Sequence, residues 1–188
     1  LRWSDVIKAA IEAGRAMDYA DFCGLDIKYV DFRRTTLSGA LFNGAILDSC
    51  DFGSMNLHDV SFRRACLDAC NFQGAGLTAE TCFHSAVLDR SRFDDARMGK
   101  WRLVGPRPIF TMGPLGDEYR NTTLYLTERG PMVRTGCFYD TLAKFVKRVK
   151  STKSRRDQCR RSYLAAARMM REYAKIWMPK ADWGRRYG

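Results

Sequence analysis

Large apolar residues recur at every fifth position between residues 22 and 98. Phenylalanine alternates with an aliphatic residue through sixteen such units, and one extra residue near Glu80 interrupts the spacing before it resumes. The sixteen central residues are Phe22, Ile27, Phe32, Leu37, Phe42, Leu47, Phe52, Leu57, Phe62, Leu67, Phe72, Leu77, Phe83, Leu88, Phe93 and Met98.

A period of five matches neither the 3.6-residue period of a helix nor the two-residue alternation of a strand. It predicts a chain that turns a corner every five residues, so that four units close a square coil of about twenty residues. The centre and the mostly small residue two positions earlier, such as Ala40 or Cys50, are expected to point inward. The other three positions are expected to face solvent. Coils would stack at the strand spacing of about 4.8 Å, with phenylalanine ladders on two opposite faces.

Asp or Asn often stands directly before the centre, as at Asp21, Asp51 and Asn71. The runs ADFCG, VDFRR, CDFGS, MNLHD, CNFQG and AVLDR resemble the A-(D/N)-L-x-x motif of the pentapeptide-repeat proteins. The resemblance covers residues 20–98 and implies a right-handed quadrilateral β-helix. The period alone leads to the same square cross-section, so the predicted core of the fold is an all-β repeat rod.

The open ends of such a rod would expose unpaired backbone, which calls for caps. Residues 1–16 are predicted to form an N-terminal capping helix that Ser4 caps and Gly14 ends. Its apolar stripe is Val6, Ile7, Ala10 and Ile11. The predicted domains are therefore residues 1–16, the pentapeptide-repeat β-helix over 17–100, and a C-terminal domain over 101–188.

The C-terminal domain is predicted to be a ββαα appendage of α+β class. NTTLYLT and PMVRTGCF form the expected hairpin, and Asp140 or Thr141 begins a helix with a regular apolar stripe. A second helix is expected from about Asp157 to Trp177. This region resembles a C-terminal extension of bacteriophage pentapeptide-repeat proteins.

The charge is uneven along the chain. The net charge is +11, made of +1 over residues 1–16, −3 over 17–100 and +13 over 101–188. Residues 144–161 hold nine basic groups and one acid, which indicates a surface for phosphate or for an acidic protein. The alternative is a solvated helix face with a flexible loop. The predicted partner-binding residues of this basic patch are Lys147, Arg148, Lys153, Arg155, Arg156, Arg160 and Arg161.

A second candidate binding surface is an acidic column on the rod. Asp48, Asp68 and Asp89 each follow a centre about one coil apart and are expected to stack. Several pentapeptide-repeat proteins, the family that this sequence resembles, imitate B-DNA in shape and charge and bind type II topoisomerases. This rod carries only −3 and is interrupted by arginines, so the resemblance extends at most to a local acidic strip. The interrupting residues are Arg33, Arg34, Arg63 and Arg64.

No group of residues in the sequence converges on catalysis. His58 and His84 fall in slots expected to face outward on different faces, and no nucleotide-binding glycine motif is present. The seven cysteines match neither a zinc site nor a disulfide framework, so we expect reduced thiols, no metal and no cofactor. Cys50 and Cys70 should stack inside adjacent coils, and their redox state is left open.

The sequence therefore predicts a binding protein and not an enzyme. The first hypothesis is a phage or prophage inhibitor or modulator of a host nucleic-acid enzyme, such as a topoisomerase or a defence nuclease complex. The alternatives are a nucleic-acid-binding adaptor that uses the basic C-terminal domain, and a structural virion component. The expected location is the bacterial host cytoplasm, with no membrane contact; a homodimer is compatible with the sequence.

Overall fold

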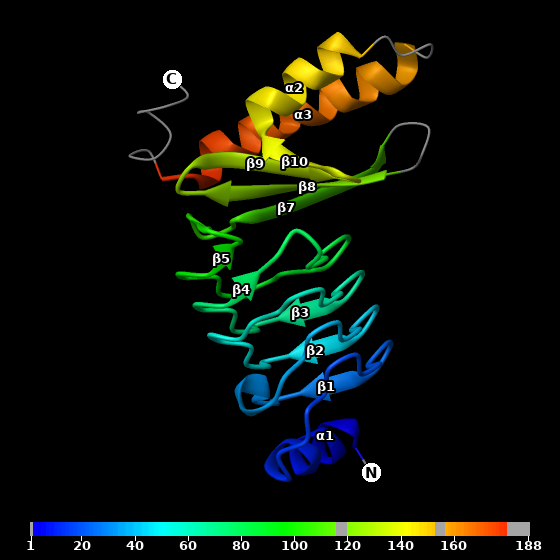
Figure 1. Ribbon diagram of the computed structural model, residues 1–188, viewed down its shortest axis with the longest axis vertical. Coiled ribbons are helices and arrows are strands. Elements are labelled where there is room, and N and C mark those ends of the chain that lie inside the picture. Colours follow the sequence, from blue (N-terminus) through cyan, green and yellow to red (C-terminus); the bar gives the residue numbers. More distant parts are fainter. Residues whose placement is uncertain (1, 116–119, 153–156, 180–188) are drawn as a thin grey trace. The chain divides into compact units, whose positions relative to one another are not determined.

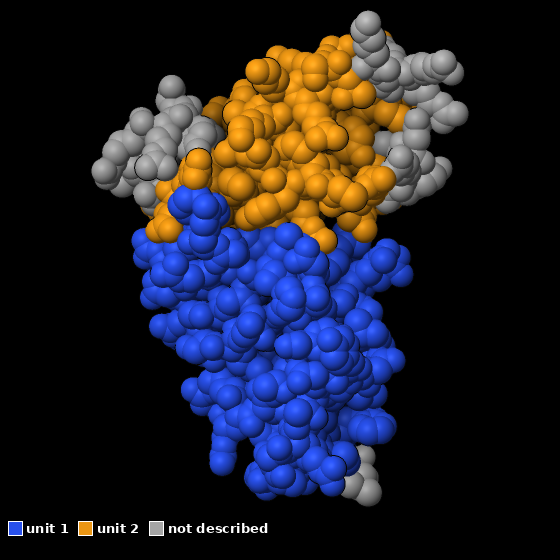
Figure 2. Space-filling model, viewed as in Figure 1, with its two compact units in different colours: residues 1–102 blue, residues 103–188 orange. Residues whose placement is uncertain are grey.

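The computed structural model describes residues 2–115, 120–152 and 157–179. The chain divides into two compact units, Leu1–Arg102 and Leu103–Gly188 (Figure 2). Trp101 and Arg102, just beyond the predicted rod boundary at residue 100, belong to the first unit because they form β6 (Trp101–Arg102). This strand pairs antiparallel with β5 (Arg97–Met98).

The first unit is a β-helix-like stack of coils held by parallel pairing (Figure 1). Strands β1 (Asp26–Lys28), β2 (Ile46–Asp48) and β3 (Cys66–Asp68) pair at an offset of twenty residues, and β4 (Gly76–Leu77) pairs with β5. Isolated parallel bridges run along the other faces, including Asp21–Leu41–Ser61 and Asp31–Asp51–Asn71. Each coil thus has four paired columns, which agrees with four units of five residues per coil.

Two phenylalanine ladders and the buried aliphatic centres fill the interior of the first unit. In one, the rings of Phe22, Phe42, Phe62 and Phe83 stack at centroid distances of 4.7–5.2 Å. In the other, Phe32, Phe52, Phe72 and Phe93 stack at 4.9–5.0 Å. Rings of the two ladders meet edge to face across the interior at 5.4–6.2 Å. The sequence prediction of stacked, inward phenylalanines is confirmed.

The extra residue near Glu80 changes the register of the stack by one. Ile46 pairs with Cys66 at an offset of twenty, whereas Cys66 pairs with Val87 at twenty-one. The chain absorbs the extra residue in a turn, where the Thr81 amide donates to the Thr78 carbonyl oxygen at 3.1 Å. Thr81 is fully buried in the inward small-residue slot, and its hydroxyl donates to the Leu57 carbonyl oxygen at 2.8 Å, which satisfies both groups.

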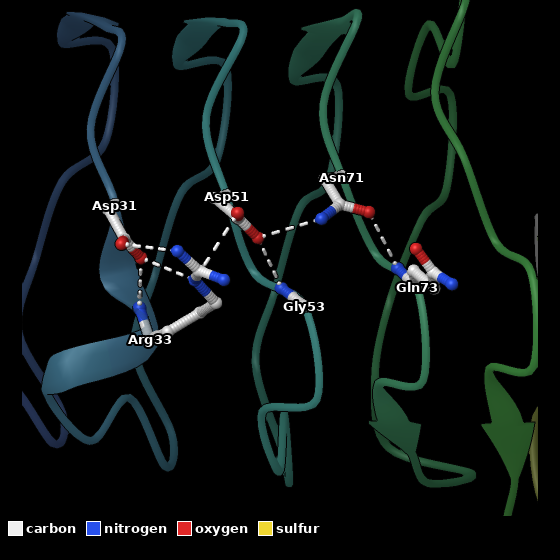
Figure 3. A network of polar contacts seen from close by, with 6 residues as sticks. All are labelled: Asp31, Arg33, Asp51, Gly53, Asn71 and Gln73. Atoms are coloured by element: carbon white, nitrogen blue, oxygen red, sulfur yellow. Dashed lines mark hydrogen bonds and ion pairs between the residues drawn. The ribbon is translucent and has the colours of Figure 1, made fainter.

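On one face of the first unit, the residues before the centres are Asp31, Asp51 and Asn71, and their side chains form a polar ladder (Figure 3). A side-chain oxygen of Asp51 accepts from the Gly53 amide at 2.8 Å, and Asn71 does the same for the Gln73 amide at 3.0 Å. The Asn71 amide group also donates to Asp51 at 3.0 Å, which joins two coils. These short side-chain-to-backbone bonds explain why Asp and Asn recur at this position.

Helix α1 (Trp3–Glu12) precedes the first coil, and it differs from the prediction at Ser4. The helix begins two residues earlier than a Ser4 N-cap implies, and Ser4 lies buried within it and makes no capping bond for the helix. Its hydroxyl oxygen instead accepts a hydrogen bond from the Lys28 amide of β1 at 2.8 Å. Because β1 is the first strand of the stack, no preceding coil can accept from this amide. Val6, placed on the predicted apolar stripe, is 40% exposed.

The second unit has four strands where two were predicted. Strands β7 (Ile109–Leu115), β8 (Arg120–Thr127), β9 (Gly130–Thr135) and β10 (Phe138–Thr141) form an antiparallel meander in the order β10-β9-β8-β7. The hairpin β8–β9 matches NTTLYLT and PMVRT, while β7 and β10 were missed. Both missed strands contain Gly, Pro or Asp, which are poor strand formers, and neighbouring strands override that preference.

Two helices pack on the sheet of the second unit. Helix α2 (Leu142–Ser151) begins at Thr141, whose hydroxyl accepts from the Lys144 amide at 3.3 Å, so Thr141 and not Asp140 is the N-cap. Helix α3 (Asp157–Trp177) contributes Ala167, Met170 and Ala174 to the core. Among the described residues, no helix is both long enough and apolar enough to cross a membrane.

Candidate functional site

A depression of about 510 Å³ in the second unit collects side chains from the sheet and both helices. Three arginines from three elements line it: Arg120 begins β8, Arg148 lies on α2 and Arg160 lies on α3. We call this depression the basic pocket. Its remaining lining residues are Thr135, Cys137, Phe138, Phe145, Val149, Thr152, Cys159 and Tyr163.

The sheet and helices place these arginines through specific local contacts. The guanidinium carbon of Arg148 lies 5.6 Å from the centre of the Phe138 ring, a cation–π contact between α2 and β10. Gly136 has a φ of +52°, and a Cβ at this position would overlap the guanidinium of Arg120. This backbone conformation favours glycine, and the Arg120 side chain occupies the space that a larger residue would fill.

Three aromatic rings line the basic pocket. Phe145 is buried, its ring meets that of Tyr163 at 6.0 Å edge to face, and it meets Phe138 at 5.6 Å. The Tyr163 hydroxyl donates to the Leu115 carbonyl oxygen at 3.3 Å, which connects α3 to β7. An apolar ring surface with guanidinium groups around it can accept a flat organic group that carries a negative charge.

A second, smaller depression of about 170 Å³ lies between α2 and α3. Lys150 from α2 and Arg168 and Arg171 from α3 line it, together with Val146, Leu164 and Ala167. We call it the basic groove. Lys147 lies on an adjoining shallow surface of α2 that also contains Lys150.

The structure distributes the predicted basic patch over both depressions. Arg148 and Arg160 meet in the basic pocket, Lys147 lies toward the basic groove, and Arg161 is exposed on α3. Lys153, Arg155 and Arg156 lie outside the described residues.

Sequence reasoning missed three further basic residues, which are Arg120, Arg168 and Arg171. Helical spacing could have found the last two, since they follow Arg160 and Arg161 on the same helix at intervals near multiples of 3.6 residues. Arg120 carried no local signal, because its contact with the helices depends on how the sheet packs.

The predicted acidic column is formed, but an arginine crosses it. Asp48 and Asp68 are direct parallel partners of β2 and β3, and the Ala69 amide bonds to the Asp89 carbonyl oxygen in the next coil. Arg90 forms an ion pair with Asp68, with Nε 2.9 Å from Oδ1, and this hydrogen bond lowers the pKa of the Asp68 carboxyl. The column therefore exposes less negative charge than its three carboxylates suggest.

The two histidines differ from the prediction that both are isolated surface groups. His84 is 7% exposed, its Nε2 lies 2.9 Å from the Ser85 hydroxyl, and its Nδ1 is buried without a hydrogen-bond partner among the described residues. Burial, aided by Arg63 and Arg64, lowers the pKa of His84. His58 is exposed, but its Nε2 lies 3.4 Å from the Asp59 carboxylate.

Cys50 and Cys70 lie buried in adjacent coils, as predicted from their spacing of twenty residues, and both are free thiols. Their sulfurs each lie 3.5 Å from a backbone carbonyl oxygen of the preceding coil. The hydrogen bond with Cys50 and burial raise the pKa of the Cys70 thiol. Both thiols fill inward small-residue slots of the core.

Fold and site together define a class: a coiled β-repeat unit joined to a basic α+β unit. A family model described as pentapeptide repeats matches residues 37–74, with eight copies of the repeat. The resemblance drawn from the repeat motif is thereby confirmed, while the likeness of the second unit to phage extensions stays a prediction. No curated protein sequence matches the chain.

Solved structures of pentapeptide-repeat proteins are among the similar folds. One is from the thylakoid lumen of Arabidopsis thaliana, with 21% identity, a TM-score of 0.30, and coverage of 46% of this chain and 64% of that one. Another is HetL of Nostoc sp., involved in heterocyst differentiation regulation, with 22% identity, a TM-score of 0.24, and coverage of 45% and 41%. A third, from Cyanothece, has 19% identity, a TM-score of 0.19, and coverage of 44% and 49%. The chain spans less than two thirds of each of these structures.

Proposed function

We propose that this chain is a non-enzymatic, macromolecule-binding protein of the bacterial cytoplasm whose second unit binds single-stranded nucleic acid. The observation that supports this most directly is the basic pocket, which three arginines and three aromatic rings line together. Proteins that bind single strands combine a positive surface for phosphates with rings on which bases stack. The pocket offers both in one place.

The dimensions and surroundings of the pocket suit this ligand. A volume of about 510 Å³ lies within the range of sites for small organic groups, and one nucleotide is such a group. Arginine recognises phosphate through paired N–H donors. The basic groove, with Lys150, Arg168 and Arg171, supplies further phosphate contacts on the same pair of helices.

The composition of the pocket supports binding without catalysis. The described residues that line it include no carboxylate and no imidazole, so they offer no general base beside Cys137 or Cys159. The first unit would then act as a spacer or as a surface for another partner.

A second candidate function is inhibition or modulation of a host nucleic-acid enzyme by a phage protein, with a topoisomerase or a defence nuclease complex as the target. The observation in its favour is the stacking of Asp48 with Asp68 in register on the rod, with Asp89 in the next coil. The arginine at position 90 opposes it, because it neutralises the middle of this column. We therefore favour nucleic-acid binding by the second unit over inhibition of a host enzyme.

The test is the affinity of the full chain for a fluorescent single-stranded oligonucleotide as a function of salt. Arg148→Gln combined with Arg160→Gln should weaken binding at low salt, and the slope of log affinity against log salt should become shallower by up to about 0.7 per lost phosphate contact. The matched control is Arg92→Gln combined with Arg97→Gln, which removes two exposed arginines from the first unit and should leave both quantities unchanged.

Equal effects of the two double variants would contradict a site in the second unit. Absence of oligonucleotide binding by the unaltered chain would reject the proposal. In that case, inhibition of a purified topoisomerase that is lost in the triple variant Asp48→Asn, Asp68→Asn and Asp89→Asn would establish the second candidate.

A further inference from the structure

Three side chains with metal-binding donor atoms meet on the surface of the first unit. They are His58, Asp59 and Glu80, and one donor atom of each lies within 4.8 Å of the other two. His58 Nε2 is 3.4 Å from Asp59 Oδ2. The expectation of separate surface groups overlooked this cluster, because Glu80 is 21 residues beyond Asp59 and belongs to the next coil.

The coil register and the extra residue explain why the three groups meet. Asn56 is bridged to Gly76, and the Leu57 amide donates to the Gly76 carbonyl oxygen at 2.9 Å, so the end of one unit lies beside the start of the irregular turn. The hydroxyl of the buried Thr81 holds that turn to the Leu57 carbonyl oxygen. Glu80 therefore projects from a turn that is fixed to the backbone next to His58.

The donor set matches a divalent transition metal. Neutral imidazole is a preferred ligand of zinc, nickel and copper, and carboxylates complete many such sites, whereas calcium and magnesium favour oxygen ligands only. Zinc bonds of about 2.0–2.2 Å place two tetrahedral ligands roughly 3.4 Å apart. The His58–Asp59 spacing of 3.4 Å already meets this requirement.

The surroundings of the cluster allow the remaining adjustment. The side chains of His58 and Asp59 are 53% and 47% exposed, and Glu80 is also exposed, so rotation of these side chains can close the distance to Glu80. Two carboxylates and a neutral imidazole give a charge of −2, which balances a divalent cation. We propose that His58, Asp59 and Glu80 bind one divalent transition-metal ion, with zinc as the reference ion and the open positions filled by solvent.

Such an ion would join two neighbouring coils at the one point where the repeat is irregular. Asp59 ends a unit of one coil, and Glu80 lies in the turn that contains the inserted residue of the next. The proposal replaces the expectation of no metal, which rested on linear spacing alone. It does not depend on nucleic-acid binding, because the two sites lie in different units.

The experiment uses the fact that the full chain contains only two histidines. Zinc chloride is titrated into the full chain while the two imidazole rings are followed by nitrogen-15 NMR. The His58 signal, assigned by its disappearance in His58→Gln, should shift and saturate at one zinc per chain, and the His84 signal should not move. Glu80→Gln should weaken zinc binding at His58 by at least about tenfold, since even the outer partners of metal ligands contribute that much.

The matched control is Glu12→Gln, because Glu12 is the only other glutamate of the first unit. It should bind zinc at His58 as tightly as the unaltered chain. Zinc bound by thiols alone, with no movement of the His58 signal, would overturn the proposal. Equal affinities of Glu80→Gln and Glu12→Gln would overturn it as well.

Discussion

Each phenylalanine inside the first unit has two kinds of aromatic neighbour. Phe52 stacks on Phe32 at 4.9 Å and on Phe72 at 5.0 Å, and it meets Phe42 and Phe62 edge to face at 5.8 and 5.4 Å. Both arrangements suit the charge distribution of aromatic rings, which favours offset stacks and edge contacts. The side chain is fully buried, so every coil depends on the rings above and below it.

Removal of one of these rings should destabilise the first unit strongly. Phe52→Ala is expected to lower the free energy of unfolding by about 3–5 kcal/mol, because it leaves a cavity between two neighbouring coils. Urea unfolding followed by circular dichroism measures this loss. The control is Tyr29→Ala, which removes an aromatic ring that is 66% exposed and should change the free energy little. Equal stabilities of the two variants would contradict the ladder.

His84 makes the stability of the first unit sensitive to pH. Its pKa lies below the ordinary 6.5 in the folded chain, because burial and the nearby Arg63 and Arg64 disfavour the charged ring. The unfolded chain therefore binds the proton at higher pH than the folded chain does. Stability from the neutral ring is present above about pH 6.5 and is lost as the pH falls below it.

The expected loss from His84 is up to about 1.4 kcal/mol per pH unit over this window. His84→Asn removes the titrating ring. Asparagine is the residue found at the equivalent position two coils earlier, Asn43. The free energy of unfolding, measured near pH 7 and near pH 5.5, should fall less in the variant than in the unaltered chain. An identical fall in both would assign the effect to other groups.

At the scale of elements, α1 protects the first strand of the stack. The Lys28 amide at the edge of β1 finds its acceptor in the buried Ser4 hydroxyl. The helix itself ends in a Schellman arrangement, in which the Arg15 amide donates to the Ala10 carbonyl oxygen and Gly14 adopts a φ of +67°. One helix thus satisfies the strand edge and its own carboxyl end.

Ser4→Ala should leave the Lys28 amide without its acceptor in the helix. The expected cost is about 0.5–1.5 kcal/mol in the free energy of unfolding, and the Lys28 amide should exchange its hydrogen faster. Ser54→Ala, at an exposed serine of the same unit, is the comparison and should have little effect. Unchanged exchange at Lys28 would show that another group accepts its proton.

The elements differ in how well the sequence predicts them. The repeats are local, since each unit of five carries its own apolar centre, so their number and their inward faces follow from spacing. Strand β7 contains Gly113 and Pro114, and β10 is short, so neither shows strand alternation. Their pairing depends on β8 and β9, and this contribution is invisible in a short window.

At the scale of the whole molecule, net charge differs strongly between the two parts of the chain. The first hundred residues are close to neutral, and the remainder carries +13. The sequence located this charge but not its grouping into sites. The basic pocket needs Arg120 from a strand and Arg148 and Arg160 from two helices, and the cluster at His58 needs a turn from another coil. Both are products of tertiary contacts.

The constant register of the first unit bears on how such a chain can change in evolution. Between residues 21 and 71, each paired residue meets its partner twenty positions away. If a segment of that length, such as residues 41–60, is lost or duplicated, each remaining strand still pairs with the strand at the equivalent position of the next coil. The phenylalanine ladders and the cap formed by α1 remain in phase. The length of the stack can thus change in whole coils without a change of register, whereas the pairs that span the extra residue near Glu80 are offset by twenty-one.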